Sequence, residues 1–231
     1  MKRSEINARI DQAIAFCNEQ KFYLPKWATW SPDDWKQAGP EADEIRQRLL
    51  GWDLTDFGSG EYDKKGLLLF TIRNGELSDD GGRMAKDYCE KLLLMGEEQV
   101  TPTHFHWAKM EDIINRGGGN MVIELWNADP DTEELDDVNE VTVSVDGIEK
   151  TVPAGGKVVL EPGESITLPP YMYHTFYGQA GKGRVLGGEV SRVNDDANDN
   201  RFLQPLPRFP EIEEDQPARY LLCTEYPPAA G

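Results

Sequence analysis

Between residues 66 and 190 the chain is a succession of short apolar segments separated by turn-forming residues. Short segments at this spacing are typical of an antiparallel sandwich or barrel. The expected strands cover residues 66–72, 121–126, 141–145, 148–152, 157–160, 165–168, 173–177 and 184–190. Asn74-Gly75 ends the first strand, and Asp146-Gly147 suits a two-residue hairpin turn. A second hairpin is expected around Pro162-Gly163, so the sequence predicts a mainly β protein built on a β-barrel.

The first fifty residues show helical spacing instead. Ser4 is the expected cap of a helix with apolar residues at positions 6, 10, 13, 14 and 17. Ser31, followed by Pro32 and two aspartates, marks a second helix start, and residues 41–50 are expected to form a third helical piece. We therefore expect one domain over residues 1–231, with a helical N-terminal extension over 1–60 and the β-barrel over 66–226.

Charge and cysteine content exclude several classes of protein. The net charge is −18, from 24 Lys and Arg against 42 Asp and Glu, and such a surface repels nucleic acid and anionic membranes. The three cysteines are scattered and form no C-x-x-C pair, which argues against a disulfide framework and for a reducing compartment. The N-terminus lacks the apolar core of a signal peptide, and the longest apolar run, 67–70, is too short to span a bilayer. We expect a soluble, cytoplasmic protein with no nucleic-acid or membrane partner.

All three histidines of the chain fall in one spaced pattern. His104 and His106 are two residues apart, so on a strand both imidazoles would point to the same face. Glu111 follows five residues later, and His174 lies on a later expected strand, after Pro169-Pro170. Three imidazoles and one carboxylate suit Mn, Fe, Co, Ni or Zn. The sequence therefore predicts a divalent metal site formed by His104, His106, Glu111 and His174.

The spacing around these residues resembles the two signature motifs of the cupin superfamily. The first is His104-x-His106, four residues, Glu111, five residues and Gly117; the second is Gly163, five residues, Pro169, four residues and His174. The resemblance implies a cupin-type β-barrel, or jelly roll. Two positions depart from the pattern: Tyr171 replaces the usual glycine, and Gly178 replaces the usual asparagine.

A narrower resemblance extends over nearly the whole chain. It rests on residues 101–107, Lys109, the run 111–120, Glu124 to Asp129, the Pro-Gly-Glu-Ser run at 162–165, and residues 188–191 and 193–196. These segments are similar to the D-lyxose isomerase family. The resemblance implies interconversion of D-lyxose and D-xylulose, or of D-mannose and D-fructose, with Mn²⁺ or a similar divalent ion in a homodimer.

Aldose–ketose isomerisation moves hydrogen between C1 and C2, so it needs an acid/base group beside the ion. Lys109, Glu189 and Glu111 itself are the candidates for this role. Residues proposed to bind sugar hydroxyls are Lys91, Asp196, Asp199 and Arg201. An enediol route is expected, with a hydride shift as the alternative.

Other functions fit parts of the pattern. A cupin Fe(II) dioxygenase would use the same four ligands, and a non-catalytic cupin could bind a sugar without turnover. A phosphosugar isomerase would need a cluster of Arg or Lys for the phosphate. Gly117-Gly118-Gly119 is expected to form a tight turn rather than a nucleotide loop, because no Lys-Ser/Thr follows it. Residues 129–140 are expected to form an acidic surface loop.

Overall fold

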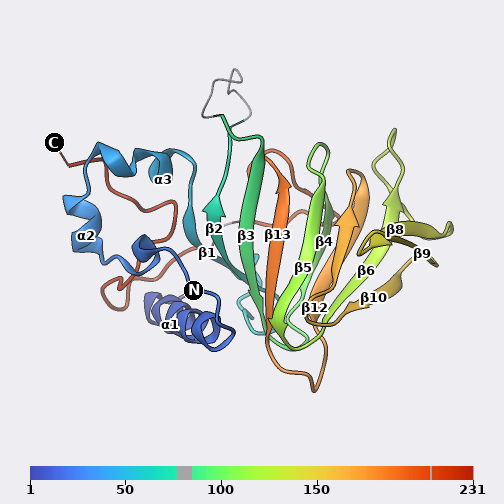
Figure 1. Ribbon diagram of the computed structural model, residues 1–231, viewed down its shortest axis with the longest axis horizontal. Coiled ribbons are helices and arrows are strands. Elements are labelled where there is room, and N and C mark those ends of the chain that lie inside the picture. Colours follow the sequence, from blue (N-terminus) through green and yellow to red (C-terminus); the bar gives the residue numbers. More distant parts are fainter. Residues whose placement is uncertain (77–84, 209, 231) are drawn as a thin grey trace.

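The computed structural model describes residues 1–76, 85–208 and 210–230, and its strands form two antiparallel sheets (Figure 1). The first sheet has the order β1-β2-β3-β13-β5-β11-β8-β9. Its strands are β1 (Gly51–Thr55), β2 (Leu67–Arg73), β3 (Tyr88–Met95), β13 (Val185–Arg192), β5 (Glu111–Gly118), β11 (Ser165–Leu168), β8 (Val141–Val145) and β9 (Ile148–Val152). The second sheet has the order β10-β6-β12-β4-β14, with β7 paired to β6. Its strands are β10 (Gly156–Leu160), β6 (Met121–Ala128), β12 (Met172–Gly178), β4 (Thr101–Phe105), β14 (Arg201–Phe202) and β7 (Leu135–Asp136).

The two sheets pack face to face around one apolar core. Leu69 of β2 and Ile113 of β5 enter this core from the first sheet, and Ile123 of β6 and Phe176 of β12 enter it from the second. Period-two alternation along each strand sends these side chains inward, and their burial is the main force that closes the sheets on each other. The predicted β-barrel is confirmed.

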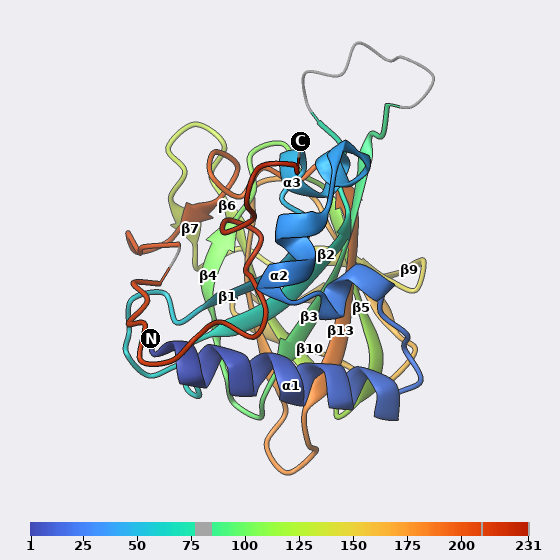
Figure 2. The same cartoon turned by 90° about the vertical axis from the view of Figure 1, so that its left-hand side faces the viewer.

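Strand β2 is apolar over most of its length, and β3 is apolar over residues 92–95, because both faces are covered there. In β2, Leu67 and Leu69 face the core between the sheets, whereas Leu68 and Phe70 belong to a second apolar cluster. The helix α1 (Arg3–Glu19) supplies the other side of that cluster, lying across the outer face of the first sheet (Figure 2). A continuous apolar run is what a strand between two apolar layers requires.

The helical extension is present, with different starts and ends from those expected. Helix α1 begins at Arg3, and its cap is Lys2, whose N–H donates to the Glu5 carboxylate at 3.1 Å. Ser4 is therefore inside the helix, and its hydroxyl donates to Asp215 at 2.6 Å. The second predicted start is correct: helix α2 (Pro32–Gln37) is capped by Ser31, whose side chain accepts from the Asp34 N–H.

The third helical piece is much shorter than expected. Residues 41–50 divide into the end of the 3-10 turn η2 (Pro40–Ala42), the helix α3 (Asp43–Gln47) and an irregular stretch in which Leu49 has a φ of 50°. This left-handed conformation ends the helical segment. The strand β1 follows it, within residues 1–60, which were expected to be mostly helical. A further 3-10 turn, η1 (Lys26–Thr29), precedes α2.

One of the two expected hairpins is present. Asp146 and Gly147, with φ values of 51° and 79°, join β8 to β9 as predicted. The hairpin around Pro162-Gly163 was wrong, because β10 pairs with β6 whereas β11 pairs with β5 and β8. The chain crosses from one sheet to the other at this turn, where the Gly163 N–H donates to the Asn115 carbonyl at 2.8 Å.

After β14 the chain leaves the barrel and returns to the helices (Figure 2). The Arg3 guanidinium is buried and pairs with Glu214 and Glu225, and Leu222 packs into the cluster of α1. The strands therefore end well before residue 226, the expected limit of the barrel. The three cysteines are buried and free. None of the helices in the described parts of the chain is long and apolar enough to cross a membrane.

Candidate metal and sugar site

The four predicted metal donors converge inside the barrel. His104 lies on β4, His106 just after it, Glu111 begins β5, and His174 lies on β12 directly opposite His104 in the strand register. Candidate ligand atoms of the three histidines lie within 4.8 Å of one another. The Glu111 Oε1 is 3.4 Å from the His106 Nε2 and 3.2 Å from the His174 Nε2. All four side chains are buried.

Backbone carbonyls fix the orientation of the three imidazoles. The Nδ1 atoms of His104, His106 and His174 lie 2.8, 2.5 and 3.0 Å from the carbonyls of Pro102, Asp199 and Met172, respectively. A carbonyl only accepts, so each Nδ1 carries the hydrogen and each Nε2 is left with a lone pair. Such contacts are the usual outer support of a metal-ligating histidine.

The Nε2 lone pairs of the histidines and the Glu111 carboxylate therefore face one another with no proton between them. The His174 Nε2 is buried and has no hydrogen-bond partner among the described residues, although it faces the Glu111 carboxylate. Burial, followed by the neighbouring histidines, holds the pKa of His104 well below its ordinary value, so its ring is neutral. Converging lone pairs and a carboxylate fit a divalent cation, which would satisfy all of them at once.

Lys109 joins the metal donors to a second carboxylate. Its Nζ is 2.8 Å from the Glu111 Oε2 and 2.8 Å from the Glu189 Oε1. Burial, the largest single effect, would raise the pKa of each carboxyl. The Lys109 ammonium, together with His106 at Glu111 and Lys91 at Glu189, outweighs it, so both pKa values lie below their ordinary range. Burial would lower the pKa of Lys109, and the two carboxylates reverse that effect. The trio is therefore an ammonium between two ionised carboxylates.

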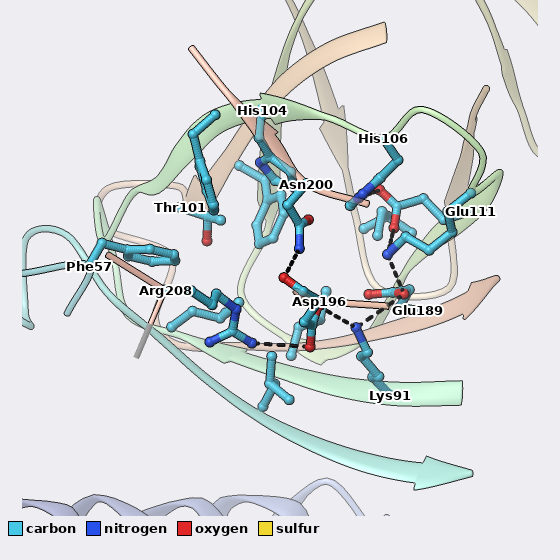
Figure 3. A pocket seen from close by; sticks show the side chains of 17 residues that line it. Phe57, Lys91, Thr101, His104, His106, Glu111, Glu189, Asp196, Asn200 and Arg208 are labelled. Atoms are coloured by element: carbon cyan, nitrogen blue, oxygen red, sulfur yellow. Dashed lines mark hydrogen bonds and ion pairs between the residues drawn. The ribbon is translucent and has the colours of Figure 1, made fainter. Parts of the chain in front are cut away.

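A cavity opens beside these residues and is lined by His104, His106 and Glu111, among others. Lys91 and Asp196 extend the charge network along it (Figure 3). The Lys91 Nζ is 3.6 Å from the Glu189 Oε1, 3.5 Å from the Asp196 Oδ1 and 2.5 Å from the Asn194 Oδ1. Burial alone would raise the pKa of Asp196, but Lys91 and then Arg208 hold it well below the ordinary value. Lys91 and Asp196, both predicted to bind sugar, line the same cavity as three of the metal donors, His104, His106 and Glu111.

The other two predicted sugar-binding residues, Asp199 and Arg201, do not line the cavity. The Asp199 carboxylate accepts from the N–H groups of Ala108 and Lys109, both at 2.9 Å. The Arg201 Nε pairs with Glu133 at 3.1 Å, so this side chain binds part of the expected acidic loop. The structure thus gives Asp199 and Arg201 contacts with the protein rather than positions in the cavity wall.

Several cavity residues were absent from the sequence-based list of sugar-binding candidates. Arg208 and Asn200 contribute polar groups, Phe57 and Phe202 contribute apolar walls, and Thr101 lies on β4. Arg208 comes from the irregular segment after β14, where no hydrophobic periodicity predicts the direction of a side chain. Together with its opening to solvent, the cavity contains about 470 Å³ of space not filled by protein atoms.

The two departures from the cupin motifs have local explanations. Tyr171 keeps the left-handed backbone that glycine usually provides, with a φ of 58°, and its ring stacks on Phe105 with centroids 5.1 Å apart. At Gly178 a Cβ would lie 2.5 Å from the Gly96 carbonyl oxygen. An asparagine would not fit at this position without a shift of the backbone. Glycine at 178 therefore allows the close approach of Gly96.

The two-sheet barrel, with three histidines and a glutamate converging inside it, defines a cupin-type protein whose histidine cluster is able to hold a metal ion. The family model for D-lyxose isomerase matches residues 1–226, and the chain belongs to this family. It is 49% identical over 227 residues to a D-lyxose/D-mannose isomerase of Escherichia coli O157:H7, and 52% identical over 227 residues to one of Serratia proteamaculans. Each alignment covers 98% of both chains. The chain is therefore a sugar isomerase.

Solved structures with similar folds include L-ribose isomerases. The enzyme of Geodermatophilus obscurus is 18% identical, with a TM-score of 0.59 over 88% of this chain and 92% of that one. The enzyme of Acinetobacter sp. DL28, solved in complex with L-ribose, is 15% identical, with a TM-score of 0.57 over 88% and 93%. At these identities the likeness establishes the fold alone.

Proposed function

We propose that the chain is a metal-dependent aldose–ketose isomerase for free sugars, interconverting D-lyxose with D-xylulose and D-mannose with D-fructose. The observation that carries this proposal is the Lys109 ammonium, held 2.8 Å from a carboxylate of the metal-donor set and 2.8 Å from a second carboxylate, Glu189. The proposed metal site and a separate carboxylate for acid/base chemistry thus lie beside each other. The names of the two curated relatives supply the substrate class.

His104, His106, His174 and Glu111 would hold the metal, and we propose Mn²⁺ as the ion. Their donor set also accepts Zn, Co, Fe or Ni. When bound, a divalent ion supplies Lewis-acid polarisation of the sugar carbonyl.

Glu189 is the proposed base. Lys109, Lys91 and the Ser191 hydroxyl all approach its Oε1, at 2.8, 3.6 and 3.0 Å, so the carboxylate is oriented and kept ionised. In the open-chain aldose it takes the proton from C2 and, after this proton has exchanged with solvent, delivers a proton to C1, while a proton passes from O2 to O1. The C2–H and O2–H bonds break, the C1–H and O1–H bonds form, and the net charge does not change. This sequence passes through an enediol of the sugar.

Lys109 is suited to a different task. Because its pKa is raised by the two carboxylates, it is a protonated cation rather than a base. We assign it the role of holding positive charge beside the developing oxyanion and fixing Glu111 and Glu189 relative to each other. Glu111 serves as a metal donor in this scheme and leaves proton transfer to Glu189.

The cavity cations favour a free sugar over a phosphosugar. Lys109 contacts Glu189 at 2.8 Å, Lys91 contacts Asp196 at 3.5 Å, and Arg208 contacts Asp53 at 2.5 Å. A phosphate group would therefore meet carboxylates beside each of these cations, which opposes its binding. The hydroxyl groups of a neutral sugar can hydrogen-bond to either partner.

A panel assay tests the proposal. The protein is stripped with a chelator, reloaded with Mn²⁺, and incubated with D-lyxose, D-mannose, other free aldoses and their phosphates. We expect ketose from free D-lyxose and D-mannose only after reloading. Oxygen consumption would favour the dioxygenase alternative, and binding without ketose would favour the sugar-binding alternative. Faster turnover of a phosphosugar would overturn the free-sugar assignment. The homodimer implied by the family resemblance and the cytoplasmic location expected from the cysteine content stay predictions.

A further inference from the structure

Thr101 supplies an unpaired polar group to the wall of the cavity. Its side chain lines the cavity, only 3% of the residue is exposed, and its Oγ1 has no hydrogen-bond partner among the described residues. A buried hydroxyl without a partner is destabilising, so natural proteins seldom retain one without a reason. Thr101 lies three residues before the first metal donor, His104, on the same strand.

A β-bulge explains why the Thr101 side chain points into the cavity. Residues three apart on a regular strand point to opposite faces. Strand β12 pairs His174 with His104 and Phe176 with Thr101, so two steps along β12 match three steps along β4. The extra residue reverses the alternation, and Thr101 and His104 both line the cavity. Bulges next to active sites commonly redirect a side chain in this way.

Other groups satisfy the backbone of the bulge. The Thr101 carbonyl accepts from the Thr175 hydroxyl at 2.6 Å, and the Pro102 carbonyl contacts the His104 Nδ1 at 2.8 Å. Pro102 has no N–H to place in the sheet. The Thr101 hydroxyl therefore has no bond that holds β4 among the described residues, and it remains free to bind a ligand.

We propose that the Thr101 hydroxyl binds a hydroxyl group of the substrate beyond C2. This inference rests on the proposed sugar-isomerase function. Figure 3 places Thr101 on the side of the cavity near Phe57 and Arg208, whereas Glu111 and Glu189 lie on the opposite side. A sugar whose C1 and C2 face Glu189 would extend its remaining carbons toward Thr101. The hydroxyl is thus a determinant of affinity and sugar specificity, remote from the reacting carbons.

The substitution Thr101→Val removes the hydroxyl and keeps the branched shape. We expect KM for the preferred sugar to rise roughly tenfold, with kcat nearly unchanged, because a bond made equally before and during the reaction contributes to binding only. The metal-free variant should also unfold at a temperature about 2–4 °C higher, since an unpaired buried hydroxyl is replaced by a methyl group. Thr101→Ser should keep KM within about threefold of the original, because it keeps the hydrogen-bonding group.

Thr175→Val is the matched control. It makes the same change on the neighbouring strand, where the hydroxyl does have a protein partner. We expect this variant to unfold at a lower temperature, the opposite sign from Thr101→Val. Unchanged KM in Thr101→Val, or a lower unfolding temperature for it, would show that Thr101 has a structural role and would overturn the proposal.

Deoxy sugars identify the partner hydroxyl without relying on any variant's fold. The original enzyme is assayed with 3-, 4- and 5-deoxy analogues of D-lyxose and 3-, 4- and 6-deoxy analogues of D-mannose, and the panel is repeated with Thr101→Val. One deoxy analogue should bind the original enzyme more weakly than the parent sugar does. The same analogue and the parent sugar should bind Thr101→Val equally well. If, for every analogue, the fold-loss from the missing sugar hydroxyl is the same in Thr101→Val as in the original enzyme, the proposal is wrong. If the original enzyme converts no free sugar at all, the proposed function itself fails, and the two failures are thereby distinguished.

Discussion

Replacing Lys109 with Met should separate metal binding from turnover. The Lys109 Nζ is 2.8 Å from both Glu111 and Glu189, and its side chain is 3% exposed. Methionine keeps the length and the apolar stem of lysine and removes the positive charge. Two buried carboxylates then face each other without the cation that separates them, and burial is left to raise the pKa of both.

The size of the effect follows from this geometry. At 2.8 Å and an effective dielectric constant of about 20, each contact has a Coulomb energy of roughly 6 kcal/mol before desolvation is subtracted. Breaking a buried ion pair by removing one partner costs about 3–5 kcal/mol in net terms. We expect the metal-free variant to lose about that much free energy of unfolding. A bound divalent cation would restore positive charge beside Glu111, so the metal-loaded variant should lose less.

The difference between the stability lost without metal and the stability lost with metal equals a difference in metal affinity. A ligand that restores more stability to the variant than to the original protein binds the variant more tightly. Urea unfolding with and without Mn²⁺, together with calorimetric titration of Mn²⁺, should therefore show equal or tighter metal binding in Lys109→Met. The value of kcat should fall at least about a hundredfold, because the cation that fixes Glu189 is gone.

Lys91→Met is the control, since Lys91 is equally buried and contacts Glu189 and Asp196 without contacting Glu111. It should destabilise the protein without tightening metal binding. Loss of Mn²⁺ from Lys109→Met would mean that Lys109 supports the metal site rather than the reaction. Near-normal turnover would refute its assigned role altogether.

Three further predictions follow from the site and the turn beside it. Asp199→Ala should weaken Mn²⁺ binding by about tenfold or more in calorimetric titration, because it frees the segment between His106 and Lys109; weakened sugar binding with unchanged metal affinity would contradict this. The depressed pKa of Asp196 means that its ionised form contributes stability that is complete above about pH 4 and is lost as pH falls further. Asp196→Asn should therefore be less stable than the original protein in urea at pH 7, by a margin that shrinks below pH 4; a constant margin would contradict the assignment. Tyr171→Gly should unfold with a free energy about 1 kcal/mol higher than Tyr171→Ala, because only glycine relieves the left-handed backbone; equal stability would contradict it.

The sequence predicted the barrel and the four converging donors because both depend on local spacing. Turn residues mark the ends of the strands, and the histidine pair needs only the alternation of a strand to face one cavity. The expected strands did not include β1, β3 or β5. The strand β1 was missed because its five residues follow a helical stretch without a clear boundary. The corner at Pro162-Gly163 was taken for a hairpin because both connections use the same turn residues, and only the pairing partners distinguish them.

The remaining site residues depend on contacts that no local pattern encodes. Asp199 and Arg201 are polar and close in sequence to Asp196, yet only Asp196 lines the cavity. Thr101 is directed inward by a bulge whose existence depends on pairing with β12, some seventy residues away. Arg208 reaches the cavity from a segment without regular structure. Which polar side chains enter the cavity is therefore a tertiary property.

The central claim is that Glu189 carries a proton between C1 and C2 of a free sugar in a metal-loaded site. Isomerisation of D-lyxose or D-mannose in D₂O, followed by NMR, tests it most directly, with the original protein and Glu189→Gln compared at matched Mn²⁺ content. We expect ketose labelled with deuterium at C1 from the original protein, and no ketose from the variant despite bound Mn²⁺. Unlabelled ketose would indicate a hydride shift, and labelled ketose formed at an undiminished rate by Glu189→Gln would contradict the assignment of the base.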